Sequence, residues 1–139
     1  MKYTDNIHLI NYIESDNIFR FKEELLNSIF FLKGNREELD KVIELAVRKS
    51  SFRFDIHQEI DLNQNLSFED KYAQETLNMK ENFSKERLNY LLEIYDTYYS
   101  KKEYSYDIPE STKKSSNVVV AVVVVGIAVA SLVLYKILN

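Results

Sequence analysis

The sequence of 139 residues contains no cysteine and no tryptophan, and only two glycines, two histidines and one proline. Without cysteine the chain has no disulfide, no thiolate metal site and no cysteine nucleophile. The two glycines, Gly34 and Gly126, are too far apart to form a glycine-rich phosphate-binding loop. The histidines, His8 and His57, are also distant in the sequence. We therefore predict that the protein is not an enzyme and has no catalytic residue, no metal site and no cofactor.

A long uncharged segment lies in the last part of the chain. Residues 118–134 read VVVAVVVVGIAVASLVL, in which only Ser131 has a polar side chain. At about 1.5 Å per residue, a helix over 118–138 spans roughly the 30 Å hydrocarbon core of a bilayer. In lipid a single segment must be helical, because its backbone groups have to pair with one another. The sequence therefore predicts a single transmembrane helix over 118–138 that anchors the protein by its C-terminal tail.

The residues around and within this segment indicate how it would sit in the membrane. Four residues would flank it at the membrane surface: Lys113, Lys114, Tyr135 and Lys136. The two lysines before the span favour a cytosolic position for the N-terminal domain, at the inner membrane if the protein is bacterial. Gly126 and Ala130 form a small-xxx-small pair that would allow two anchors to pack closely as a homodimer.

The part of the chain before the anchor is acidic. Of the 18 basic side chains only Lys113, Lys114 and Lys136 lie beyond residue 112, whereas all 22 acidic side chains precede it, so residues 1–112 carry a net charge of −7. This charge disfavours nucleic acid, whose affinity depends on neutralised phosphates, and it suits a basic protein partner.

Apolar residues recur at helical spacing through residues 1–100, which predicts an all-α fold, a small helical bundle of four to five helices. The second expected helix has the clearest stripe, at spacings of three and four residues: Ile18, Phe21, Leu25, Ile29 and Leu32. Phe19 would widen this stripe. Gly34 is placed to end the helix in a left-handed turn, and this short break predicts an antiparallel hairpin with the third helix.

Small polar residues mark where each expected helix begins, because their side chains accept hydrogen bonds from free N–H groups of the first turn. In chain order, the expected caps are Thr4 or Asp5, Ser15 or Asp16, Asn35, Ser67 and Ser84. The third helix would bury Leu39, Val42, Ile43, Ala46 and Val47. The fifth would bury Leu88, Leu91, Leu92, Tyr95 and Tyr99, and would leave Tyr90, Ile94 and Tyr98 on its outer face.

Residues 52–62, FRFDIHQEIDL, alternate between apolar and polar side chains, which predicts an extended loop with its apolar side on the helices. The other side would carry Asp55, His57, Glu59 and Asp61. We consider three interpretations of these residues: a solvated face, an acidic edge that binds a partner, or a metal site. One imidazole among carboxylates two residues apart is a weak metal-binding pattern, so no metal is predicted.

Two tyrosines complete the set of candidate partner-binding residues. Exposed tyrosines are common anchors of protein interfaces, which makes Tyr90 and Tyr98 candidates beside the acidic segment. The alternative is that tyrosines of this region belong to the core or, for Tyr104 and Tyr106, to the lipid interface.

The composition changes after residue 100 to lysine, serine, tyrosine and the single proline, Pro109. We therefore divide the chain into a soluble helical domain over 1–100, a polar tether over 101–117 and the anchor over 118–138. A flexible tether of this length would let the domain range roughly 20–25 Å from the membrane.

Two stretches, FRFDIHQEIDLN at 52–63 and ENFSKERLNYLLEIYDTYY at 81–99, resemble the small acidic helical immunity proteins of bacterial polymorphic toxin systems. The resemblance implies a non-enzymatic inhibitor that masks or plugs a toxin, with a basic toxin domain as its partner. The anchor departs from most of these soluble proteins, and it would fit a toxin that acts at or crosses the inner membrane.

We therefore predict a tail-anchored membrane protein whose cytosolic helical domain binds and restrains a protein partner. Its partners would be the lipid bilayer and a protein, and not nucleic acid. One alternative is a membrane-perturbing effector that oligomerises through Gly126 and Ala130. Another is a tail-anchored apoptosis regulator of the Bcl-2 type, although the Asn-Trp-Gly-Arg motif of that family is absent and the chain before the anchor is short for that fold.

Overall fold

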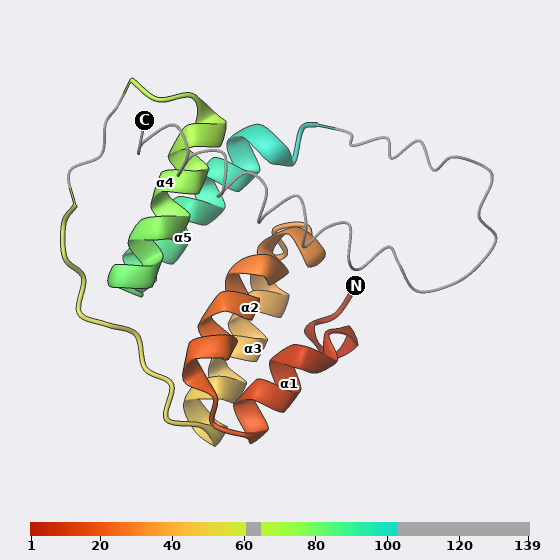
Figure 1. Ribbon diagram of the computed structural model, residues 1–139. Coiled ribbons are helices and arrows are strands. Elements are labelled where there is room, and N and C mark those ends of the chain that lie inside the picture. The colour runs from red at the N-terminus through yellow and green to blue at the C-terminus, as the bar shows by residue number, and fades with distance from the viewer. Residues whose placement is uncertain (61–64, 103–139) are drawn as a thin grey trace, which may run out of the picture.

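The computed structural model describes residues 1–60 and 65–102 (Figure 1). This part of the chain contains five α-helices and no strand: α1 (Ile7–Glu14), α2 (Ile18–Phe31), α3 (Arg36–Lys49), α4 (Phe68–Glu81) and α5 (Lys85–Ile94). A 3-10 turn (Tyr3–Asp5) precedes α1, and α5 continues directly into a π-helical turn (Tyr95–Tyr99). The prediction of an all-helical bundle is thereby confirmed.

The predicted membrane segment falls outside the described residues. The span 118–138, its flanking residues Lys113, Lys114, Tyr135 and Lys136, and the pair Gly126 and Ala130 all belong to the part of the chain after residue 102. Among the helices that are described, none is both long and apolar enough to cross a bilayer.

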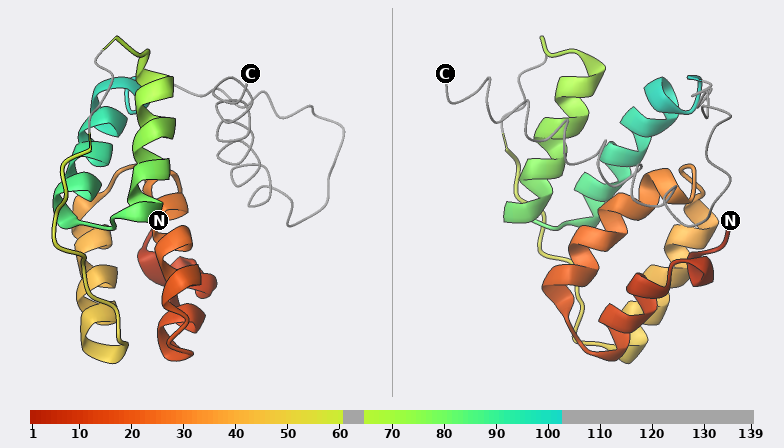
Figure 2. Two further views of the ribbon diagram at one scale, coloured as in Figure 1. Left: turned by 60° about the vertical axis from the view of Figure 1, so that its left-hand side comes forward. Right: turned by 45° about the vertical axis from the view of Figure 1, so that its right-hand side comes forward.

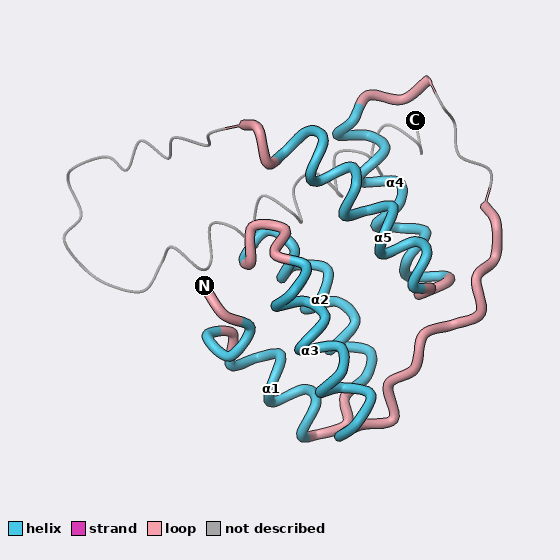
Figure 3. Tube along the Cα trace, turned by 180° about the vertical axis from the view of Figure 1, so that it is seen from behind, coloured by secondary structure: helices cyan, strands magenta, loops and turns pink. Residues whose placement is uncertain are grey.

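The helices form two groups that pack against each other (Figures 1 and 3). Helix α1 packs on α2 and α3, which form the expected antiparallel hairpin, while α4 and α5 form a second antiparallel pair. Residues 50–60, which follow α3, run back along the outside of the helices (Figure 2, left). Aromatic side chains join the two groups, since the Phe30 ring of α2 lies 5.0–5.4 Å from the rings of Tyr72, Tyr95 and Tyr99.

Polar side chains cap the start of each helix. The caps are Asn6, Asn17, Asn35, Ser67 and Ser84, and each side chain accepts a backbone hydrogen bond from the first turn. The last three were predicted. At α2 the cap is Asn17 and not Asp16, because Asp16 adopts a left-handed conformation (φ 51°) and its carboxylate instead accepts hydrogen bonds from the N–H and hydroxyl of Ser51.

The buried core follows most of the predicted stripes. Phe21, Leu25 and Ile29 of α2 are fully buried, as are Leu39, Val42 and Ala46 of α3 and Leu88, Leu91 and Leu92 of α5. Phe19, however, is 68% exposed, and Val47 also reaches the surface. Ile94 is buried rather than on an outer face, because α5 borders both α3 and α4 and so is covered on two sides.

Candidate functional site

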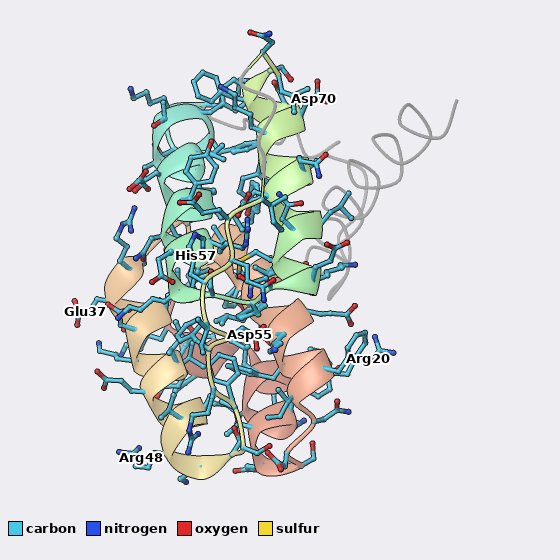
Figure 4. The ribbon with its side chains drawn as sticks, turned by 90° about the vertical axis from the view of Figure 1, so that its left-hand side faces the viewer. Arg20, Glu37, Arg48, Asp55, His57 and Asp70 are labelled. Carbon is cyan, nitrogen blue, oxygen red and sulfur yellow. The ribbon has the colours of Figure 1, made fainter. Side chains whose placement is uncertain are left out.

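The extended segment after α3 is fastened to the connection between α4 and α5. The N–H of Asp55 donates to the carbonyl of Phe83 (3.0 Å), and the N–H of Phe83 donates to the carboxylate of Asp55 (2.7 Å). Beyond this pair, the Asn82 amide donates to the Ile56 carbonyl (2.9 Å) and accepts from the Gln58 N–H (3.1 Å). These four bonds fix the path of residues 55–58 across the helices (Figure 4).

A buried ion pair lies beneath this connection. Arg87 of α5 and Glu75 of α4 meet at 2.9 Å, and their side chains are only 3% and 1% exposed. Arg87 also donates to the carbonyl of Gln58 and to Asn82, while Asn78 donates to the second oxygen of Glu75. A charge buried to this extent is tolerated only when it is paired and its remaining hydrogen bonds are satisfied. The network therefore ties α4, α5 and the extended segment together.

His57 makes a third connection to the same place. Its Nδ1 atom lies 2.8 Å from the hydroxyl of Ser84, a buried residue that caps α5 by accepting the N–H of Arg87. The hydroxyl accepts the N–H of Arg87 and still has a proton and a second lone pair, so it pairs with Nδ1 of either imidazole tautomer. This serine is committed to a helix cap, and the pair fastens the segment to α5.

The predicted acidic edge is therefore divided by the structure. Asp55, His57 and Glu59 are all exposed, but Asp55 and His57 also make hydrogen bonds within the domain, and Asp61 lies outside the described residues. The expected alternation also fails after Phe54, because Ile56 is 90% exposed and not laid on the helices. Among the described residues, no group of acidic or histidine side chains is arranged to hold a metal ion.

The two candidate tyrosines lie apart from this segment. Tyr90 and Tyr98 are both half-buried and pack against the hydrophobic core. Tyr98 stacks on Phe68 at the start of α4, with 5.4 Å between the ring centroids. Partner binding by these tyrosines and by the acidic segment stays a prediction.

A shallow groove lies between α3 and α5. Its volume is about 270 Å³. Five apolar residues line it: Leu39 and Ile43 from α3, Leu88 and Leu92 from α5, and Phe54 from the extended segment. Five polar residues line it as well: Arg36, Asp40, Glu44, Lys85 and Asn89. Four of the apolar residues were predicted as core positions of two separate helices and Phe54 as part of the extended segment, but the groove depends on how these elements meet.

The bonds described above position one wall of this groove. Phe54 stands immediately before Asp55, and its ring stacks on Phe83 at 6.2 Å and meets Phe52 edge-on at 5.2 Å. The α5 wall is oriented by the Ser84 cap and by the Arg87 ion pair. The sequence pattern did not reveal the ion pair, since the pairing of two charges twelve residues apart depends on the angle between α4 and α5.

The charges on the groove are unequal. Asp40 and Glu44 lie one turn apart on α3, both exposed, and neither makes an ion pair with any described residue. Lys85 on the α5 side is the opposing cation, because Arg36 is already paired with Asp96 at 2.8 Å. Within the described part of the chain, two carboxylates and one ammonium without ion pairs therefore lie beside an apolar floor.

The neighbouring acidic residues of α3 do not add to this charge. Lys41 lies 2.7 Å from Glu37 and 2.8 Å from Glu38. The hydrogen bond from Lys41, aided by that from the N–H of Tyr3, holds the pKa of Glu38 below its usual value. These carboxylates are thus paired within the domain, and the negative charge of α3 that has no ion pair among the described residues lies at the groove.

No known protein family, no curated protein and no solved structure matches this chain. The function of this protein therefore has to be inferred from the geometry of the groove and from the sequence of the tail.

Proposed function

We propose that this chain is a non-enzymatic, tail-anchored membrane protein whose cytosolic domain binds and restrains a protein partner. The α3–α5 groove receives a basic amphipathic segment of that partner. One observation carries the proposal, namely an apolar floor beside two carboxylates, Asp40 and Glu44, that lack a partner among the described residues.

The size of the groove favours side chains over a whole small molecule. Small-molecule pockets usually enclose about 300–1,000 Å³, and this groove, at about 270 Å³, falls below that range. An amphipathic helix that lies in a groove inserts apolar side chains at spacings of three and four residues. Lysine or arginine residues beside those anchors would reach Asp40 and Glu44.

The tail and the charge of the chain support the same proposal. Residues 1–112 carry a net charge of −7, which favours encounter with a basic protein. The apolar segment over 118–138 would hold the domain at the cytosolic face of a membrane. Immunity to a toxin that acts at or crosses this membrane is the most concrete form of the proposal, with a basic toxin domain as the partner, and the resemblance at 52–63 and 81–99 supports it.

A charge-reversal experiment tests the proposal. The full-length protein is extracted in mild detergent and used to capture the co-expressed product of the neighbouring gene. Asp40→Lys with Glu44→Lys should weaken capture at least tenfold, which corresponds to about 1.4 kcal/mol. The matched control is Glu14→Lys with Glu81→Lys, which makes the same change of charge at exposed positions of α1 and α4 that do not line the groove.

The outcomes separate the two parts of the proposal. Capture of the neighbour by the wild type and the control, with loss in the groove variant, supports a partner in the groove. Undiminished capture by the groove variant contradicts the groove as the site. Failure of the wild type to retain the neighbouring gene product contradicts the immunity role.

A further inference from the structure

A partly exposed aromatic pair lies where α4 begins and the π-helical turn follows α5. Phe68 is the first residue of α4 and Tyr98 belongs to the π-helical turn after α5. Their rings stack with 5.4 Å between centroids and 19° between planes. Phe68 is 41% exposed, whereas Tyr98 packs its other side on the core. A rigid aromatic surface is thereby presented to the outside at this end of the domain.

Lysines surround this pair. The ammonium of Lys71 lies 5.6 Å from the centroid of the Phe68 ring, and that of Lys102 lies 3.8 Å from the Tyr98 ring and donates to its hydroxyl. Lys101, next to Lys102 in the sequence, is exposed. Two carboxylates share the area, Glu69, which pairs with Lys102 at 3.4 Å, and Asp70.

The local charge is opposite to that of the domain. The three lysines outnumber the two carboxylates around the aromatic pair, whereas residues 1–102 contain four more acidic than basic side chains. Lysine beside aromatic rings is the composition that favours the headgroup level of an anionic membrane. This end of the domain presents lysine and aromatic side chains together to such a membrane.

The position of this surface in the chain also points to the membrane. Lys102, within the surface, is separated from Val118 by residues 103–117. Fifteen residues span at most about 50 Å even when fully extended, because each contributes about 3.3–3.6 Å. An anchor at 118–138 therefore keeps this surface close to the bilayer, where even a weak contact forms readily because the effective concentration is high.

The opposite end of the domain lacks this arrangement. Asp70 marks the end that holds the aromatic pair, and Arg48, in the last turn of α3, lies at the far end (Figure 4). Phe19 near the start of α2 is 68% exposed, but its cation is Arg20, at 5.9 Å, and its sequence position is far from the tail. Phe19 thus provides a natural comparison for Phe68.

We propose that the Phe68–Tyr98 surface, with Lys71, Lys101 and Lys102, docks on the anionic lipid surface of the membrane that holds the anchor. The inference rests on the proposed membrane anchoring. Phe68 enters the headgroup region, and the lysines lie among the anionic headgroups. This contact fixes the orientation of the domain, and with it the position of the α3–α5 groove relative to the bilayer.

The absence of tryptophan allows a direct test. Phe68→Trp introduces a single tryptophan into the full chain. The variant is reconstituted in two kinds of nanodisc, one of phosphatidylcholine alone and one of phosphatidylcholine mixed with phosphatidylglycerol. In the mixed discs the emission of Phe68→Trp should shift to the blue, and brominated lipid should quench it. High salt should reverse both effects, because it screens the lysines. Phe19→Trp is the matched control and should show neither effect.

A second variant tests the contribution of the lysines. Lys71→Glu with Lys101→Glu, added to Phe68→Trp, should abolish quenching in the mixed discs while the helical circular dichroism is unchanged. Equal emission and quenching for Phe68→Trp and Phe19→Trp would contradict docking of this surface on lipid. A protein would then be the remaining candidate for binding to it. Failure of the full chain to enter nanodiscs at all would overturn the anchor, and the docking inference with it.

Discussion

Arg87 and Glu75 form a buried ion pair in which the guanidinium and carboxylate are 2.9 Å apart and both side chains are almost fully enclosed. Removing one member of such a pair leaves an unpaired buried charge and costs about 3–5 kcal/mol. We expect Glu75→Leu to lower the free energy of unfolding by that amount. Arg87→Met added to Glu75→Leu should restore part of the loss, because the stranded charge is gone. Urea unfolding of the two variants and the wild type measures this, and simple addition of two large losses would contradict it.

Gly34 lies in the turn that connects α2 and α3 and has a left-handed conformation with φ 69°. A β-carbon at this position would lie 2.7 Å from two ring carbons of Tyr95. Gly34→Ala should therefore lower stability by at least the 1–2 kcal/mol that the left-handed conformation alone costs. Lys33 is also left-handed (φ 52°), so Lys33→Gly is the opposite control and should be neutral or stabilising. Thermal unfolding that ranks the two variants in the reverse order would refute this account.

The end of α2 at Gly34 illustrates what the sequence could reveal. The left-handed conformation of Gly34 and the caps Asn35, Ser67 and Ser84 were predicted, because local chemistry determines them, but the left-handed Lys33 that comes directly after the C-cap Leu32 was not. The stripe of α2 was also predicted, because burial of one helix face leaves a regular spacing in the sequence.

Features that depend on contacts between distant segments were not predicted. Asp16 does not cap α2 as expected, because its carboxylate accepts a hydrogen bond from Ser51, thirty-five residues later. Ile56 faces outward because Asp55 and His57 on either side of it are bonded to the α4–α5 connection. The groove likewise needs the relative placement of α3 and α5, which periodicity within each helix does not specify.

The contact between Asp16 and Ser51 predicts a dependence of stability on pH. Hydrogen bonds from the N–H and hydroxyl of Ser51 lower the pKa of Asp16 below its usual value of 3.8. A carboxyl whose folded-state pKa is depressed stabilises the fold above its unfolded pKa, and this stability is lost as the pH falls through the folded pKa. Asp16→Asn keeps the left-handed turn, since asparagine tolerates it, but removes the titration. The fall in urea midpoint below about pH 4 should be shallower in this variant than in the wild type, and identical profiles would contradict the assignment.

Phe54 and Ile56 are two residues apart in the extended segment and should respond very differently to substitution. Phe54 lines the groove and contacts Phe52 and Phe83, whereas Ile56 is 90% exposed. Phe54→Ala should cost about 2–4 kcal/mol, somewhat less than a fully buried phenylalanine, and should weaken capture of the partner. Ile56→Ala should change stability by less than about 0.5 kcal/mol. Chemical unfolding compares them, and an equal loss in both variants would show that the segment lies differently on the helices.

The proposed anchor makes the most direct prediction about location. Residues 118–138 contain one charge, Lys136, near their end, so a helix over this range should remain in the bilayer when peripheral proteins are washed away. After alkaline carbonate extraction we expect the full-length protein in the membrane pellet, and a variant lacking 118–138 in the supernatant. Ala128→Asp places a charge at the centre of the span, at a cost of about 2.5–3.5 kcal/mol for insertion, and should shift part of the protein to the supernatant. Recovery of the unaltered full-length chain in the carbonate supernatant would refute the anchor. The proposed contact between the helical domain and the lipid surface, which rests on the anchor, would then be refuted as well.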